Sequence, residues 1–132
     1  MRKIRIKICL LAAMLAVATG IQASDFVVDE LCYNITDAEA KTVEVAKYDY
    51  AVDGEMVRPT KMDVVVPMTV VNPNDNQTYR VTALGDGAFT VYGLRGGWFD
   101  YTSIVLPEGL LEIKANAFSG QSNLTSLVIP GT

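Results

Sequence analysis

The sequence predicts a mainly β protein whose C-terminal half is a solenoid of about two repeats, preceded by a β-rich N-terminal region. Two observations support this class. Between Phe26 and Tyr79 the apolar residues are largely β-branched or aromatic, which favours strands over helices. Beyond Thr82 two sequence units recur with the same internal spacing, which is typical of stacked repeats.

The N-terminus has the three parts of an export signal. Four cationic side chains in Met1–Lys7 precede the apolar run Ile8–Ala18, and small residues follow it. The apolar run is about half of the roughly 20 residues that cross a bilayer, so we expect no membrane span after cleavage. We place cleavage after Ala23, with Gly20 as the alternative. The mature protein is therefore expected to be exported and either secreted, surface-displayed or periplasmic.

The mature chain is strongly acidic. Four of the 11 basic residues lie before the cut and all 15 acidic residues lie after it, which leaves seven against 15 and a net charge of −8. Nucleic acid and anionic membrane surfaces would be repelled by this charge. We expect neither as a partner.

The N-terminal region reads as short strands separated by polar turns. Asp53-Gly54 predicts a turn, and Pro67 closes a buried strand because proline cannot donate to a central ladder. The expected strands cover Phe26–Val28, Leu31–Ile35, Thr42–Lys47, Val64–Val66 and Thr78–Thr82, with a hairpin loop at Thr36–Lys41 and a second loop at Asn72–Asn76.

The two repeated units each contain a return segment and a strand. Ala83–Phe89 aligns with Glu112–Phe118, and both place an aliphatic residue five positions before a phenylalanine that follows alanine. Tyr101–Pro107 aligns with Leu124–Pro130 in the pattern apolar-x-x-apolar-x-apolar-Pro. We therefore expect parallel pairing between the two strands and equivalent conformations in the two return segments.

Alternation along each strand predicts which side chains fill the core. Ile104 and Leu106 point to one side, as do Leu127 and Ile129, and one coil cannot bury this side alone. From the return segments we expect core contributions from Leu110, Ile113 and Phe118. The last strand has no polar capping element after it, so we expect the array to continue beyond Thr132, with a dimer or partner cap as the alternative.

The first unit is longer than the second and carries an aromatic insertion. Phe89 and Pro107 are 18 positions apart, whereas Phe118 and Pro130 are 12 apart. In solenoids such extra residues usually form a loop on one face. The insertion covers residues 90–100, and it supplies the residue types enriched in binding hot spots: Tyr92, Arg95, Trp98 and Phe99, with Tyr101 at its edge.

Two alternatives to this partner-binding hypothesis stay open. Trp98 and Phe99 could instead fold back as a plug over the repeat core, since large aromatic side chains are seldom fully solvated. Trp98 could also stack on a sugar, which glycan arrays with Trp98→Ala would separate from protein binding.

A second candidate surface is the outer face of the repeat strands. Small polar side chains there suit broad contacts rather than a deep pocket. The alternative interpretation is that they are simply good strand formers. The residues are Thr102, Ser103, Val105, Thr125, Ser126 and Val128.

The sequence predicts no catalysis, cofactor or metal site. It contains no histidine, so the serines lack a triad partner and Cys32 lacks an obvious activating base. Cys9 leaves with the signal, so Cys32 is the single thiol of the mature chain and is expected to be a small buried hydrophobe. The oxygen-rich loop at Asn72 fails as a calcium loop of the EF-hand type, because Gln77 and Ala83 replace the required glycine and glutamate.

The repeat motifs resemble the BspA-like leucine-rich repeats of bacterial surface proteins. That family's unit reads approximately Leu-Thr-Ser-Ile-x-Ile-Pro followed by Ile-Gly-x-x-Ala-Phe, which Leu124–Pro130 and Leu84–Phe89 match closely. The segment Phe26–Thr36 looks like the β segment that precedes such arrays, and Gln121 stands where the family often has cysteine. The resemblance implies a secreted or surface-exposed recognition module, since some members are adhesins that bind host matrix proteins.

Together these observations divide the chain into a signal peptide (1–23), a β-rich N-terminal cap region (24–78) and leucine-rich repeats (79–132). We expect a non-catalytic module for protein recognition or adhesion outside the cytoplasm, with an extracellular or cell-surface protein as its partner. The alternatives are a purely structural cap of a longer array and a glycan-binding surface protein.

Overall fold

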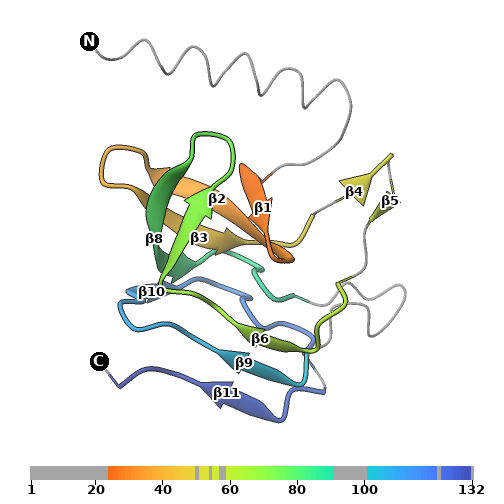
Figure 1. Ribbon diagram of the computed structural model, residues 1–132. Helices are drawn as coiled ribbons and strands as arrows, with labels where there is room; N and C mark the ends of the chain where they lie inside the picture. The colour runs from red at the N-terminus through yellow and green to blue at the C-terminus, as the bar shows by residue number, and fades with distance from the viewer. Residues whose placement is uncertain are drawn as a thin grey trace, which may run out of the picture.

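The computed structural model describes residues 24–49, 51–53, 55–56, 59–90, 101–121 and 123–131. The expected signal peptide and residues 91–100 of the insertion lie outside this part. Within it the secondary structure is entirely β (Figure 1). The strands are β1 (Phe26–Val28), β2 (Leu31–Asp37), β3 (Thr42–Ala46), β4 (Ala51–Val52), β5 (Glu55–Met56), β6 (Asp63–Val65), β7 (Thr69–Asn72), β8 (Gln77–Leu84), β9 (Ser103–Val105), β10 (Glu112–Ile113) and β11 (Ser126–Val128).

The N-terminal sheet combines antiparallel hairpins with parallel strands. β2 pairs antiparallel with both β1 and β3, and β3 pairs in parallel with β8 on its other side. The β1–β2 turn consists of Asp29 and Glu30, both with positive φ (51° and 66°), as a two-residue hairpin turn requires. The expected hairpin loop before Thr42 is confirmed, although β2 extends to Asp37.

A second hairpin joins β7 to β8, and the sequence analysis missed its first strand. The turn covers residues 73–76 and contains Asn76 at φ 60°, within the loop expected there. The Asn72 side chain accepts the Asn74 N–H at 2.9 Å, and Asp75 accepts the Gln77 N–H and the Tyr79 hydroxyl at 2.9 and 2.7 Å. These side-chain oxygens therefore stabilise the turn. No cluster suited to a metal ion is found among the described residues.

The repeat strands form a parallel sheet of three strands in the order β11-β9-β6. The predicted pairing of β9 with β11 is confirmed, with Ile104 opposite Leu127. β6 adds a rung that the repeat alignment did not include, because Val64 pairs with Ile104 in the same register. Figure 1 shows the three strands stacked in order below the N-terminal sheet.

The return segments of the two units are equivalent, as predicted. Leu84 pairs in parallel with Ile113, and the Phe89 N–H donates to the Ala117 carbonyl at 2.6 Å. The rings of Phe89 and Phe118 stack with their centroids 5.8 Å apart and an interplanar angle of 12°. Each coil therefore covers the apolar side of its neighbour.

The core lies between the mixed N-terminal sheet and the parallel three-stranded sheet, and it is complete only in the inner coils. Leu84 and Ile104 are fully buried, and Leu106 is nearly so. In the last coil the prediction of buried side chains is wrong for Ile113, Leu127 and Ile129, which are 43%, 38% and 59% exposed. The reason is that no further coil covers them within the described residues, so their apolar side faces solvent.

The Cys32 thiol is buried, as expected. Cys32 is 1% exposed, and burial raises its pKa from 9.0 to about 11. Below pH 9 this shift lowers the thiolate fraction about 100-fold, so we expect Cys32 to react at least that much more slowly with a disulfide reagent in the native protein than in denaturant. A colorimetric thiol assay with and without guanidinium chloride measures both rates. Rapid labelling of the native protein would contradict this placement.

Candidate functional site

The structure describes one of the five residues predicted to bind a partner through the insertion. Tyr92, Arg95, Trp98 and Phe99 lie outside the described residues. Tyr101 is 3% exposed and packs edge-on against Phe89, with ring centroids 5.6 Å apart and planes at 89°. Burial raises the pKa of its hydroxyl to about 12. Tyr101 therefore lies in the core, where its ring packs beside Phe89.

Gln121, which stands where similar repeats often have cysteine, connects Tyr101 and Phe89 through two hydrogen bonds of its side chain. Its side-chain oxygen accepts the Tyr101 N–H at 2.9 Å, and its amide nitrogen donates to the Phe89 carbonyl at 2.7 Å. An amide can donate and accept at once, so one side chain satisfies two main-chain groups of the preceding coil.

The second predicted surface is formed as expected. We call it the ladder face, and it consists of the side chains on the solvent side of the parallel sheet. β6 extends it by one rung beyond the six residues predicted from sequence. Its members are Asp63, Val65, Ser103, Val105, Ser126 and Val128 on the strands, with the exposed Thr102 and Thr125 directly before β9 and β11.

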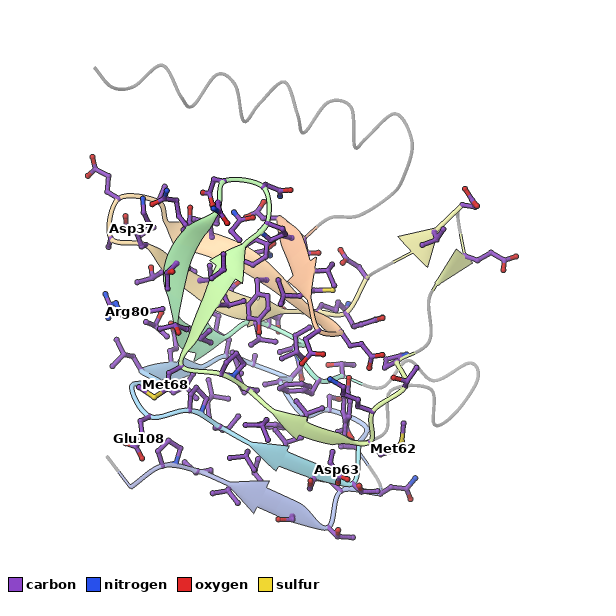
Figure 2. The ribbon with its side chains drawn as sticks, viewed as in Figure 1. Asp37, Met62, Asp63, Met68, Arg80 and Glu108 are labelled. Carbon is purple, nitrogen blue, oxygen red and sulfur yellow. The ribbon has the colours of Figure 1, made fainter. Side chains whose placement is uncertain are left out.

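One end of the ladder face is polar and ordered by hydrogen bonds. Asp63 lies at the start of β6 (Figure 2), and its carboxylate accepts the hydroxyls of Ser103 and Thr102 at 2.8 and 3.0 Å. These bonds lower the pKa of Asp63, so it stays ionised at neutral pH. On the next rung the Thr125 hydroxyl donates to the Thr102 carbonyl at 3.1 Å. Hydroxyl side chains at the start of β9 and β11 thus lie beside the Asp63 carboxylate of β6, in one polar row across the three strands.

The other end of the ladder face is apolar. Val65, Val105 and Val128 occupy the same register position on consecutive strands. Val65 is 69% exposed and Val128 is 48% exposed. Val105 between them is half-buried. A valine row beside a polar row gives a shallow surface that suits a broad contact rather than a bound small molecule.

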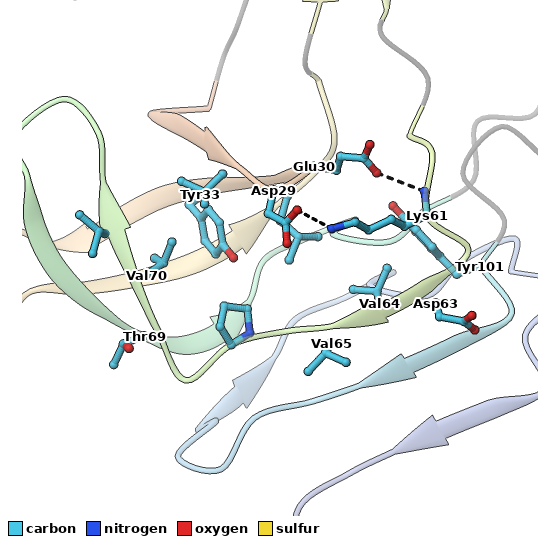
Figure 3. Close-up of a pocket in the computed structure, with 14 residues that line it drawn as sticks. Asp29, Glu30, Tyr33, Lys61, Asp63, Val64, Val65, Thr69, Val70 and Tyr101 are labelled. Carbon is cyan, nitrogen blue, oxygen red and sulfur yellow. Dashed lines mark hydrogen bonds and ion pairs between the residues drawn. The ribbon is translucent and has the colours of Figure 1, made fainter.

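A groove of about 550 Å³ lies next to this face, between the β1–β2 turn and β6 (Figure 3). Sequence analysis did not find it, because its walls come from segments about 30 residues apart. Lys61 forms an ion pair with Asp29 across one end. The Glu30 carboxylate accepts the N–H and hydroxyl of Thr60 at 2.9 and 2.6 Å, and the N–H of Lys61 at 3.2 Å.

The charged end of the groove is stabilised in its ionised form. Partial burial alone would raise the pKa of Glu30, but the hydrogen bonds from Thr60 and Lys61 outweigh it and lower that pKa. The ion pair with Asp29 raises the pKa of Lys61. The Glu30 carboxylate therefore presents negative charge at neutral pH.

Comparison with known proteins identifies the fold. No family model and no curated protein matches the chain. A solved leucine-rich repeat protein from Bacteroides ovatus is 31% identical, with a TM-score of 0.59 over 80% of this chain. A leucine-rich repeat protein from Bacteroides capillosus is 20% identical (TM-score 0.58, 77% of this chain). A leucine rich cell surface protein from Faecalibacterium prausnitzii is also 20% identical (TM-score 0.57, 86% of this chain).

This chain spans 24%, 62% and 25% of the length of those three proteins, respectively. No helix among the described residues has the length and apolar character needed to cross a membrane. The stacked parallel rungs, the repeated motif and these solved structures agree. The chain is a bacterial leucine-rich repeat protein, as its resemblance to the BspA-like repeats predicts.

Proposed function

We propose that the mature protein is a non-catalytic recognition or adhesion module outside the cytoplasm, and that it binds a partner protein through the ladder face. The observation that carries this proposal is the alignment of a polar row (Asp63, Ser103 and Ser126) and a valine row (Val65, Val105 and Val128) on the outer side of three parallel strands. Such rows place no bulky side chain in the way of a broad partner surface.

Covering the apolar row of the ladder face with a partner would be energetically favourable. Val65 and Val128 leave apolar area in water, and burial of such area under a partner stabilises a complex by about 25 cal/mol per Å² before the costs of association. The polar row would then supply hydrogen bonds that fix the partner's orientation.

The expected partner is an extracellular or cell-surface protein. A location outside the cytoplasm is supported by the signal-like N-terminus and by the similarity to a cell surface protein of Faecalibacterium prausnitzii. The resemblance to BspA-like repeats makes host matrix proteins the first candidates. The net charge of −8 on the mature chain favours partners with basic surfaces.

Binding to a panel of immobilised matrix proteins, measured by surface plasmon resonance, tests the proposal. We expect Ser126→Arg to weaken binding at least tenfold, because a long charged side chain would hold the partner away from the sheet. Thr78→Arg is the matched control, since Thr78 is exposed on β8 in the other sheet. Equal binding by both variants would rule out the ladder face, and a purified protein with turnover would overturn a non-catalytic role.

A second candidate is a purely structural cap that starts a longer array. The exposed apolar residues of the last coil favour it, Leu111 at 81% and Ile129 at 59% above all. Under this alternative, the present chain binds nothing in the panel while a longer form of the protein does.

A further inference from the structure

We propose that the groove beside β6 holds an extended segment of a partner protein, which pairs with the free edge of β6 as an added strand. This inference rests on the proposed recognition function and names how one part of the partner is held. Main-chain pairing would give the affinity, and the groove walls would select the side chains.

The edge of β6 that faces away from β9 offers main-chain groups that pair with none of the described residues. The Met62 carbonyl accepts the Thr102 N–H at 2.8 Å, and the Val66 N–H donates to the Val105 carbonyl at 2.9 Å. Even-numbered residues of this segment therefore face β9, and the N–H and C=O groups of Asp63 and Val65 face the groove.

Nothing in the described part of the chain occupies that edge. β6 is the outermost strand of its sheet, and no described residue hydrogen-bonds to the main chain of Asp63 or Val65. Natural proteins usually cover or block such an edge, because it is a template for another strand. Three residues span roughly 10 Å, enough for a short strand.

The walls of the groove are apolar where an added strand would place its side chains. Val65 and Val71 are 69% and 48% exposed, and the other apolar lining residues include Val28, Val64, Pro67 and Val70 (Figure 3). The volume of about 550 Å³ lies within the range of about 300–1,000 Å³ typical of ligand sites. The groove therefore fits alternating valine-sized side chains.

The charges at the groove select the ends of the added strand. Asp29, Glu30 and Asp63 supply three carboxylates, and Lys61 is the cation among the described lining residues. The Lys61–Asp29 ion pair is exposed to solvent, since 50% of the Lys61 side chain and 72% of the Asp29 side chain are accessible. Replacing Lys61 by a cation of the partner therefore costs little free energy. A lysine or arginine on the partner would gain Asp29 or Asp63 as a new partner. The expected occupant is thus an apolar extended segment flanked by basic residues.

A fluorescein-labelled peptide, Lys-Val-Thr-Val-Thr-Val-Lys with blocked ends, tests this proposal by anisotropy on the mature protein. Val65→Pro removes an N–H from the free edge and leaves the bonds to β9 in place. We expect it to weaken peptide binding at least about fivefold. Leu127→Pro is the matched control, because it makes the same change on the outer edge of β11.

A second variant separates docking from any loss of fold. Val65→Lys adds a charge to an exposed position, and we expect it to weaken binding of the lysine-flanked peptide and to improve binding of a glutamate-flanked version. Thermal unfolding, monitored by circular dichroism, checks that both variants are folded. The proposal is overturned if wild-type protein does not bind the peptide, if Val65→Pro and Leu127→Pro behave alike, or if the charge swap has no effect. Such a failure leaves the proposed function standing whenever Ser126→Arg still weakens matrix-protein binding.

Discussion

Replacing Phe89 with alanine is expected to lower the free energy of unfolding by about 4 kcal/mol. Phe89 is 2% exposed, stacks on Phe118 of the next coil and contacts the Tyr101 ring edge-on. The substitution removes all of these contacts and leaves a cavity between two coils, which the main-chain bond to Ala117 prevents from closing. Denaturant unfolding measures the loss, which we expect as a lower unfolding midpoint at an unchanged m-value.

Phe118→Ala provides the comparison within the same stack. Phe118 is only partly buried, so its removal should cost clearly less than the removal of Phe89. Equal losses for the two variants would show that the coils do not differ in burial as the structure describes.

Gly85→Ala is expected to destabilise the protein by about 2 kcal/mol, although only one methyl group is added. A Cβ at this position would lie 2.9 Å from the Glu44 carboxyl group and 3.0 Å from the Val45 carbonyl oxygen. The carboxylate has little freedom to withdraw, because Lys114 holds it at 3.0 Å. Thermal or denaturant unfolding gives the change in stability.

Two variants show which contacts of the added Cβ at position 85 cause the loss of stability. Glu44→Ala combined with Gly85→Ala should recover part of the loss, since the main-chain contact with Val45 remains. Gly131→Ala should change stability little, because nothing lies within 4 Å of the added Cβ. A neutral Gly85→Ala would mean that β3 and the first return segment are not as close as described.

The repeat was predictable from sequence wherever two copies share their motif. Leu84 pairs with Ile113 and Ile104 with Leu127, as the alignment of the two units required. β6 was missed as a rung because Asp63-Val64-Val65-Val66-Pro67 lacks the Thr-Ser pair of the other copies. Its apolar-x-apolar-Pro ending matches theirs and was the available signal.

Burial was predictable only where neighbouring coils could be assumed. The alternation that points Ile104 inward also points Leu127 inward, yet exposure depends on what lies beyond each strand. Tyr101 was assigned both to the edge of the aromatic insertion and to the first apolar position of the repeat motif, and its packing against Phe89 agrees with the second assignment.

The ladder face could be predicted because it follows strand alternation, whereas the groove could not. Asp29 and Lys61 are 32 positions apart, and no local pattern indicates that a hairpin turn will meet the first rung. Long-range contacts of this kind arise from packing of one sheet on another, which no repeat motif encodes.

The connections between rungs differ in length while the register of the rungs does not. Val64 and Ile104 pair across 40 positions, whereas Ile104 and Leu127 pair across 23. Doubling the length of a flexible connection adds only about 0.6 kcal/mol of closure entropy. Foreign epitopes or catalytic peptides could therefore be grafted into the connections between rungs. The connecting segments could then be exchanged while the stacked strands keep their pairing.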